Sequence, residues 1–277
     1  MVEPGPDGPG LVRVAVPGGD VYCGAGVGEK GSAPPPRRSM TPGSKGRAVP
    51  DTADTATGQA DVEFYWDPVC PWAWLTSRWV AEVAAQRNLD VDWRFISLRL
   101  LNKDKNYETD FPAGYIPGHT TGQKLLRVAA AVRAEEGRGR MGELYTQFGG
   151  DLHVRGRRHD MVDHWEAGFP DYLRSVGIEE RYLAAANDEG WDAVLQAETD
   201  EALARTGKDV GTPIISFNRE GQQHSFFGPV ISRVPRGEEA TRLWDAVWEV
   251  ATFPGLAELK RSLRERPQLA DSLIESV

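Results

Sequence analysis

Regularly spaced apolar residues begin only after about residue 60 of the 277. Before that point the chain is rich in Pro and Gly, and its apolar residues follow neither a helical nor a strand period. Such a segment cannot bury enough apolar surface to offset the entropy that it loses on ordering. We therefore predict a disordered tail over residues 1–60, a globular domain over residues 61–265 and a C-terminal tail over residues 266–277.

The globular part opens as a strand–helix–strand unit. Alternating apolar positions predict strands at residues 61–66 and 91–97. Between them, residues 71–86 carry bulky apolar side chains every three or four positions, which predicts a helix with one buried stripe. Pro71 suits the first position of this helix, because that position needs no backbone N–H.

The middle of the chain is predominantly helical, and strands return near its end. The helical period covers residues 121–136, 141–154, 161–177, 178–188 and 191–207. Strands are predicted at residues 213–218 and 223–228, joined by a hairpin turn, and helices at residues 237–252 and 255–263 follow. The order βαβ, helical block, ββα predicts an α/β protein with a thioredoxin-like fold and a large helical insertion at about residues 98–207.

Charge and composition exclude some classes of function. The formal net charge is −9 and the isoelectric point is about 5.2. An acidic globular part argues against nucleic-acid binding, which depends on neutralising phosphates. The basic patch in the tail is interpreted as solvated linker; it comprises Arg37, Arg38, Lys45 and Arg47. No apolar run is long enough to span a membrane.

Cysteine usage bears on the compartment. The chain has two cysteines, and its N-terminus lacks the features of a signal peptide, so we expect a cytoplasmic protein in a reducing compartment. Met40 is followed by a polar linker and then by the first predicted strand. We hypothesise that translation starts at Met40 or nearby, which would remove Cys23 from the native protein.

Cys70 lies between the first predicted strand and the helix after it, in the stretch WDPVCPWAW. The first N–H groups of a helix lack backbone partners, and the helix dipole adds positive charge there, so both favour a thiolate. A pKa lowered from about 8.5 to about 6.5 would raise the thiolate fraction at about pH 7.5 from roughly 10% to roughly 90%. The alternative is a small buried apolar side chain, but the strand–Cys-Pro–helix context favours a reactive thiol.

Thr212-Pro213 is the second candidate feature. It follows a predicted helix and opens a predicted strand, where thioredoxin folds place a cis proline beside the redox cysteine. A cis bond there would expose the backbone of Thr212 for pairing with a substrate. The alternative is a trans proline that merely starts an edge strand.

Aromatic and histidine side chains supply the other candidates. Trp66, Trp72 and Trp74 flank Cys70; we expect at least two in the core, and Trp72 to line a flat apolar pocket beside the sulfur. The spacing of His153, His159 and His164 matches no metal-binding motif, so we expect surface positions and no metal site. His153 ends a polar helix and is our candidate for contact with a thiol cofactor.

Several stretches form a recognisable set. They are Cys70-Pro71-Trp72 after FYWDPV, SRW in the first helix, ISLRLLN after it, Thr212-Pro213 after DVG, and FFGPVISRVPRGEEATRLWD at residues 226–245. Together they resemble the mycothiol-dependent reductases of actinobacteria, in the DsbA-like thioredoxin superfamily, over nearly all the chain beyond Ala60. The resemblance implies a cytosolic oxidoreductase that uses mycothiol, a small-molecule thiol, to reduce disulfides and some nitroaromatic prodrugs.

The chain departs from this family at one position. Family members carry Cys-Pro-Trp-Cys, whereas the fourth residue here is Ala73. A dithiol site attacks a disulfide with one sulfur and releases the adduct with the other, and Cys70 alone can perform only the first step. We therefore expect a monothiol mechanism, in which Cys70 attacks a mixed disulfide or an electrophile and external mycothiol or a redoxin frees it. The predicted thiol-binding residues are Pro71, Trp72, Ala73, Thr212, Pro213 and His153.

Three alternatives remain open. Cys23 could replace the missing sulfur, because the entropy of loop closure grows only with the logarithm of length, although nothing around it is shaped for docking. The protein could be a thiol transferase or isomerase like the kappa-class glutathione transferases, which share the fold. It could also be a non-catalytic module that binds thiols or client proteins.

Overall fold

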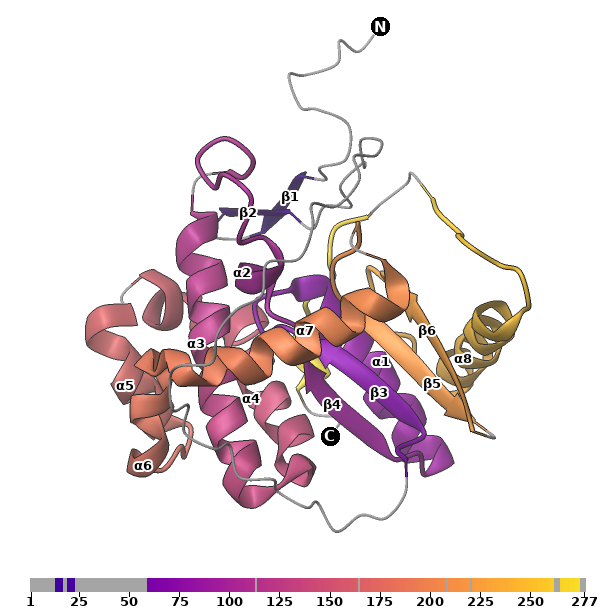
Figure 1. The fold of residues 1–277 in the computed structure, drawn as a ribbon, viewed down its shortest axis with the longest axis horizontal. Helices are drawn as coiled ribbons and strands as arrows, with labels where there is room; N and C mark the ends of the chain where they lie inside the picture. Colours follow the sequence, from indigo (N-terminus) through magenta and orange to yellow (C-terminus); the bar gives the residue numbers. More distant parts are fainter. Residues whose placement is uncertain are drawn as a thin grey trace, which may run out of the picture.

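A computed structural model gives the arrangement of most of the chain (Figure 1). The residues that it describes are 13–16, 19–22, 59–112, 114–163, 165–207, 209–219, 221–261 and 265–274. Within residues 59–274 the described elements are built around a four-stranded sheet.

The central sheet has the strand order β4-β3-β5-β6. Its strands are β3 (Val62–Trp66), β4 (Val91–Phe95), β5 (Ile214–Arg219) and β6 (Gln222–Phe227). β3 pairs in parallel with β4 and antiparallel with β5, so Phe64 lies between Trp93 and Ile215. All of β3 is buried, as expected for a central strand that is covered on both faces. The strand order confirms the predicted thioredoxin-like fold.

Helices cover both faces of this sheet. They include α1 (Pro71–Arg87), α7 (Asp192–Thr206) and α8 (Gly237–Thr252). α7 crosses one face, where Ala202 packs with Tyr65 and Ile214 (Figure 1). On the other face, the rings of Trp79 in α1 and Trp244 in α8 lie with their centroids 5.4 Å apart. In the described part of the chain, no helix is both long enough and apolar enough to cross a membrane.

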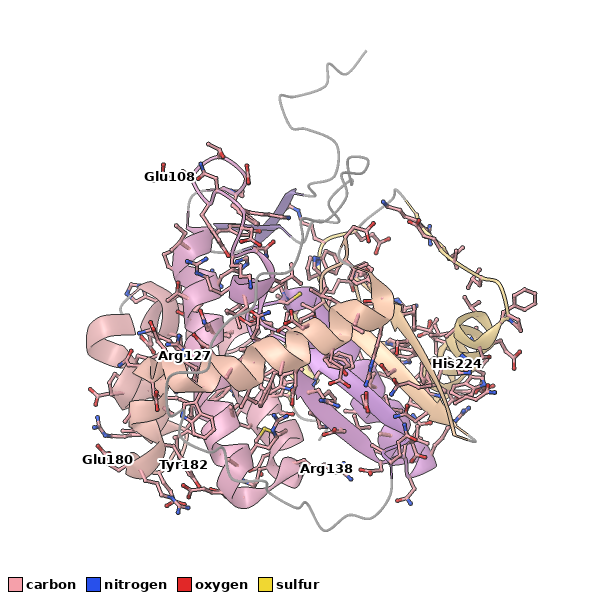
Figure 2. The ribbon with its side chains drawn as sticks, in the orientation of Figure 1. Glu108, Arg127, Arg138, Glu180, Tyr182 and His224 are labelled. Atoms are coloured by element: carbon pink, nitrogen blue, oxygen red, sulfur yellow. The ribbon has the colours of Figure 1, made fainter. Side chains whose placement is uncertain are left out.

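The helical insertion lies between β4 and β5. Before α7 its α-helices are α2 (Leu98–Leu101), α3 (Tyr115–Glu136), α4 (Met141–His153), α5 (Trp165–Ser175) and α6 (Glu180–Leu183), with short 3-10 or π turns at Arg138–Arg140, His159–Asp163, Ala184–Asn187 and Glu189–Trp191. α3 begins six residues before its predicted start, because Pro117 stands in its first turn, where a missing N–H costs nothing. Arg127 of α3 donates to both carboxylate oxygens of Asp192 at 2.6 and 2.7 Å, which joins α3 to α7 (Figure 2).

The predicted helix at residues 255–263 is wrong for the residues that the structure describes there. Residues 256–261 form no helix, and α8 ends at Thr252, just before Pro254 and Gly255. Leu256 and Leu259 are 44% and 79% exposed. A short helix with no surface against which to pack its apolar face is not stable.

The N-terminal segment contains one element that the sequence did not predict. Within residues 1–60, strands β1 (Arg13–Val16) and β2 (Gly19–Tyr22) pair antiparallel. Their β-branched valines favour extended backbone, so the expectation of disorder does not hold for these two strands. The predictions for Cys23, Met40 and the basic patch fall outside the described residues.

The C-terminal segment folds back on the body of the protein. Gln268 donates its backbone N–H to the carbonyl of Ser232 at 2.7 Å, and Leu273 is buried. Residues 265–274 therefore pack against the domain, whereas the sequence predicted a tail from residue 266.

Asp67 fixes the turn between β3 and α1. Its carboxylate accepts the backbone N–H of Val69 at 3.0 Å and that of Leu98 at 2.8 Å, so one side chain links the end of β3 to the start of α2. Gly122 of α3 lies against it, since a Cβ at that position would be 2.6 Å from Asp67 Oδ1. Burial raises the pKa of Asp67 to about 7, although both N–H groups lower it. The carboxyl group therefore titrates near neutral pH inside the core.

Asp67→Asn should change how stability depends on pH. Because the folded-state pKa is raised, the stabilising contribution of Asp67 is complete below about pH 4, and it is lost as the pH rises through about 7. In that window the group lowers the free energy of unfolding by up to about 1.4 kcal/mol per pH unit. Denaturant unfolding of both proteins from pH 4 to 8 should show this slope in the wild type only. Parallel pH profiles would contradict the assignment.

Gly149→Ala should destabilise the contact between α4 and α1. A Cβ at Gly149 would lie 2.2 Å from a ring carbon of Trp74, which is fully buried. We expect a loss of about 1–3 kcal/mol in the free energy of unfolding, as is usual for overpacking a core. Gly139→Ala is the matched control, because its Cβ would meet nothing within 4 Å. Equal stability of the two variants would show that α4 does not pack as described.

Candidate active site

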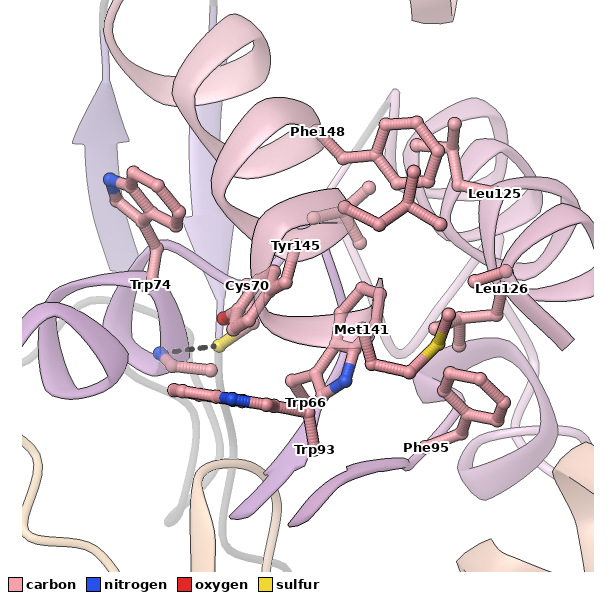
Figure 3. Close-up of a cluster of buried hydrophobic side chains, with 14 of the residues drawn as sticks. Trp66, Cys70, Trp74, Trp93, Phe95, Leu125, Leu126, Met141, Tyr145 and Phe148 are labelled. Atoms are coloured by element: carbon pink, nitrogen blue, oxygen red, sulfur yellow. Dashed lines mark hydrogen bonds between the residues drawn. The ribbon is translucent and has the colours of Figure 1, made fainter. Parts of the chain in front are cut away.

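Cys70 is the N-cap residue of α1, as the sequence predicted. Its backbone is extended, and its Sγ accepts the N–H of Ala73 at 3.4 Å, shown as the dashed line in Figure 3. The backbone N–H of Cys70 donates to the carbonyl oxygen of Asp67 at 3.2 Å. The sulfur therefore meets an amide at the positive end of a helix, an arrangement that favours a thiolate.

Thr212-Pro213 lies against the same sulfur. The peptide bond is cis, which confirms the sequence prediction, and Cys70 Sγ lies 3.6 Å from the Thr212 carbonyl oxygen. The Thr212 hydroxyl donates to the carbonyl of Tyr65 at 3.0 Å, and this bond holds the loop on β3. A thiol can donate to the Thr212 carbonyl but a thiolate cannot, so this contact favours the protonated sulfur.

The sulfur is closed off from solvent in this structure. Cys70 and Ala73 are both 0% exposed, and Trp66, Trp72 and Trp74 are at most 2% exposed. The expectation that at least two of the tryptophans are core residues is confirmed. Trp72 is itself buried in the core. In this conformation it therefore does not line an open pocket beside the sulfur.

His153 lies beside the active-site loop. It ends α4, shares a hydrogen bond of 2.8 Å with the Pro68 carbonyl through Nε2, and packs near the ring of Trp74. Burial lowers the pKa of His153, so the ring is neutral at pH 7 and donates its Nε2–H to Pro68. In this conformation His153 positions the turn that leads to Cys70; its contact with a thiol cofactor remains a prediction.

The other two histidines considered in the sequence analysis are His159 and His164. His159 is exposed, as expected, and His164 falls outside the described residues. No group of three or more His, Cys, Asp or Glu side chains within the described ranges is arranged to hold a metal ion.

Two further side chains belong to this site: Tyr145, which the sequence did not single out, and Arg78, which the sequence analysis named only as part of the SRW stretch. Tyr145 of α4 stacks on Trp66, with ring centroids 4.3 Å apart, and meets Trp74 edge-on at 5.6 Å. Arg78 of α1 is 2% exposed and lies over the ring of Trp74, with 4.2 Å from its guanidinium carbon to the ring centroid. Their sequence signals are weak, because each occupies an ordinary position on a predicted helix.

Three tryptophans close to Cys70 in the sequence carry buried N–H groups without a partner among the described residues. The buried indole N–H groups have no hydrogen-bond partner in the part of the chain that the structure describes; they belong to Trp66, Trp72 and Trp74. An unpaired buried donor costs about 1–3 kcal/mol. These groups are therefore available to acceptor atoms of a ligand.

Comparisons with known proteins agree with the geometry. Residues 69–261 match the family model described as Rv2466c-like, mycothiol-dependent nitroreductase Rv2466c. The uncharacterized protein Rv2286c of Mycobacterium tuberculosis (strain ATCC 25618 / H37Rv) is 31% identical over 205 residues, which cover 72% of this chain and 81% of the relative.

Similarity to solved structures is more distant. The cytosolic disulfide reductase DsbM from Pseudomonas aeruginosa has a TM-score of 0.44 and 15% identity, and the same protein with GSH has a TM-score of 0.43 and 14% identity. Each comparison covers 68% of this chain and 98% of the other.

The matched residues include Cys70, its helix, the cis proline and all of α8. The match confirms the sequence-based expectation of a thiol-dependent oxidoreductase. This chain therefore belongs to the family of the mycothiol-dependent nitroreductase Rv2466c.

Proposed function

We propose that the protein is a mycothiol-dependent thiol–disulfide oxidoreductase that acts by a monothiol mechanism through Cys70. The observation that carries this proposal is the position of Cys70 at the start of α1, with its sulfur on the Ala73 amide and next to the cis proline loop. The residue that would supply a second sulfur is Ala73, so release of the adduct requires a second molecule.

The proposed cycle has two exchange steps. The Cys70 thiolate attacks one sulfur of a mixed disulfide between a client and mycothiol; the old S–S bond breaks, a Cys70–mycothiol disulfide forms, and the client leaves as a thiolate that takes a proton. A second mycothiol thiolate then attacks this adduct, which gives mycothiol disulfide and frees the Cys70 thiolate. In total, the mixed disulfide and one free mycothiol are converted into the reduced client and one molecule of mycothiol disulfide, so the free thiol supplies the two electrons that the client sulfur gains.

The cycle requires movement around the sulfur. Because Cys70 is 0% exposed, a disulfide can reach it only when a covering segment is displaced. Tyr145 of α4 and the loop at Thr212 border the sulfur, and we propose that one of these segments moves to admit the substrate.

The surroundings of the sulfur suit a polar thiol substrate. The indole N–H groups and the Tyr145 hydroxyl, which no described residue pairs, are donors that could meet oxygen acceptors of mycothiol once the site opens. Client proteins with mixed disulfides, or a redoxin that accepts the adduct, are the partners that this cycle would use. It also needs a supply of reduced thiol, which favours a cytoplasmic location.

The burial of Cys70 favours a second candidate function. A sulfur that never becomes exposed is a core residue, and the domain would then bind thiols or clients without catalysis. Reaction with a small disulfide separates this candidate from the oxidoreductase, because only an accessible thiolate forms an adduct.

Incubation with mycothiol disulfide should place one mycothiol on Cys70. Whole-protein mass spectrometry should show a single adduct that free mycothiol then removes. Cys70→Ser should show none, and the matched control Cys23→Ser should behave as the wild type. If the wild type forms no adduct, or if the adduct persists in Cys70→Ser, the proposed mechanism is wrong. Conjugation of an electrophile without turnover of the mixed disulfide would instead indicate a thiol transferase.

Ala73→Cys should convert the site to a dithiol one. The Ala73 amide lies 3.4 Å from the sulfur of Cys70, so a thiol on the same residue is close enough to displace mycothiol from Cys70. We expect the variant to lose the adduct without added thiol and to end as an internal disulfide, with a mass two hydrogens below the reduced protein. Ala73→Ser, which is similar in size, should retain the adduct. An adduct that persists equally in both variants would contradict this geometry.

A further inference from the structure

A buried phenol and a buried guanidinium remain unexplained by packing alone. Tyr145 is 0% exposed, and its hydroxyl makes no hydrogen bond with any residue that the structure describes. Figure 3 shows this hydroxyl beside the sulfur of Cys70, with the phenol ring stacked on Trp66. A buried hydroxyl without a partner is costly, and the Cys70 sulfur, whose charge acts on Tyr145, is a group that could accept its proton.

Arg78 is buried, and no counter-ion for it lies in the part of the chain that the structure describes. Its Nε donates to the Ser77 hydroxyl at 3.2 Å, and its Nη1 donates to the Thr146 hydroxyl at 2.7 Å. Both partners are neutral, and no carboxylate pairs with Arg78 among residues 59–274 where they are described. Burial lowers the pKa of Arg78 to about 10, which still leaves the side chain charged at pH 7.

Charge on the sulfur and charge on Arg78 both act on Tyr145. Burial raises the pKa of Tyr145 well above its usual value, negative charge on Cys70 raises it further, and Arg78 lowers it. The guanidinium carbon lies 5.9 Å from the centroid of the Tyr145 ring. The phenol therefore stays protonated at neutral pH and lies within the fields of both the sulfur and the cation.

We propose that the Tyr145 hydroxyl donates a hydrogen bond to the Cys70 thiolate, and that Arg78 is a positioning residue that supplies the compensating positive charge. This inference rests on the proposed function, because it concerns the same sulfur. In this arrangement α4 and α1 together stabilise the Cys70 thiolate: α4 provides Tyr145, and α1 provides Arg78 and the Ala73 amide.

The arrangement would act at both steps of the cycle. When the Cys70 proton leaves, the sulfur accepts from the Ala73 amide and the Tyr145 hydroxyl, while the Thr212 carbonyl loses its donor. In the second step Cys70 departs as a thiolate, and the same two donors stabilise it as the leaving group. Tyr145 keeps its proton throughout, so the hydroxyl polarises the reaction without being consumed.

Other groups also change the pKa values of Tyr145 and Arg78. Their influence must be separated from that of the proposed hydrogen bond. Ionised Asp67 raises the pKa of Tyr145, and Arg236 acts on Arg78. Ser77 also lowers the pKa of Tyr145; its hydroxyl donates to the Trp74 carbonyl at 2.6 Å, accepts from Arg78, and keeps one lone pair as a competing acceptor. Titration of Asp67 is therefore removed by repeating the measurements in an Asp67→Asn background.

The test is the pKa of Cys70 in the full chain, measured by thiolate absorbance near 240 nm and corrected with Cys70→Ser. Tyr145→Phe keeps the ring and removes the hydroxyl, and we expect it to raise the Cys70 pKa by about one to two units, the usual effect of one hydrogen bond to a charged group. Cooperative unfolding of the variant shows that the core is intact. A wild-type pKa below that of free cysteine that stays unchanged in Tyr145→Phe overturns the inference and leaves the proposed function standing.

Arg78 provides an independent variant. Arg78→Met removes a buried cation and leaves no donor unpaired, because Thr146 donates to Gly142 and Ser77 donates to Trp74. We expect this variant to fold at least as stably as the wild type, yet to raise the Cys70 pKa; Arg78→Lys should restore part of the shift. A Cys70 pKa that is unchanged in Arg78→Met overturns the role of Arg78. A wild-type pKa at or above that of free cysteine overturns both this inference and the proposed function.

Discussion

The contact between the Cys70 sulfur and the Ala73 amide is the interaction on which the chemistry of this site depends. It offers the sulfur a donor at the positive end of α1, and so it favours the anion. The Thr212 carbonyl and complete burial act in the opposite direction, since both favour the neutral thiol. The fraction of the sulfur that is ionised, and so able to act as a nucleophile, therefore depends on two opposing effects. The Ala73 amide and the nearby positive charge favour the thiolate, whereas the apolar surroundings favour the thiol.

The helical insertion supplies much of that enclosure. α3 brings Gly122 against Asp67 and so presses on the turn before Cys70, while α4 brings Tyr145 and His153 to the same loop. In a thioredoxin-like sheet without this insertion, the end of β3 and the start of α1 would lie nearer to solvent. The insertion thus couples access to the sulfur to the packing of α4 on α1, where Gly149 lies directly against Trp74.

The absence of a second sulfur shapes how the rest of the site is interpreted. Ala73 keeps its amide on the sulfur but offers no thiol, so this position supplies a hydrogen-bond donor that favours a thiolate and no second sulfur. The indole groups and the phenol, which have no partner among the residues that the structure describes, and the cation of Arg78 form a buried region richer in donors than its aromatic composition suggests. Such a region suits an anion or an oxygen-rich ligand better than it suits a purely apolar core.

The sequence by itself determined the strands and helices around the site, the thioredoxin-like order, the capping role of Cys70 and the cis proline opposite it. These features follow from local periodicity, from the residues that start helices, and from a motif whose parts keep a fixed place in the fold. Only the tertiary structure decided that Arg78 is buried without a carboxylate partner among the described residues, that Tyr145 of a distant helix comes under the influence of charge on Cys70, and that the sulfur is closed off. The reason is physical: a helical period shows which face of a helix is buried but not which element buries it, and contacts between residues far apart in the chain depend on how whole elements pack.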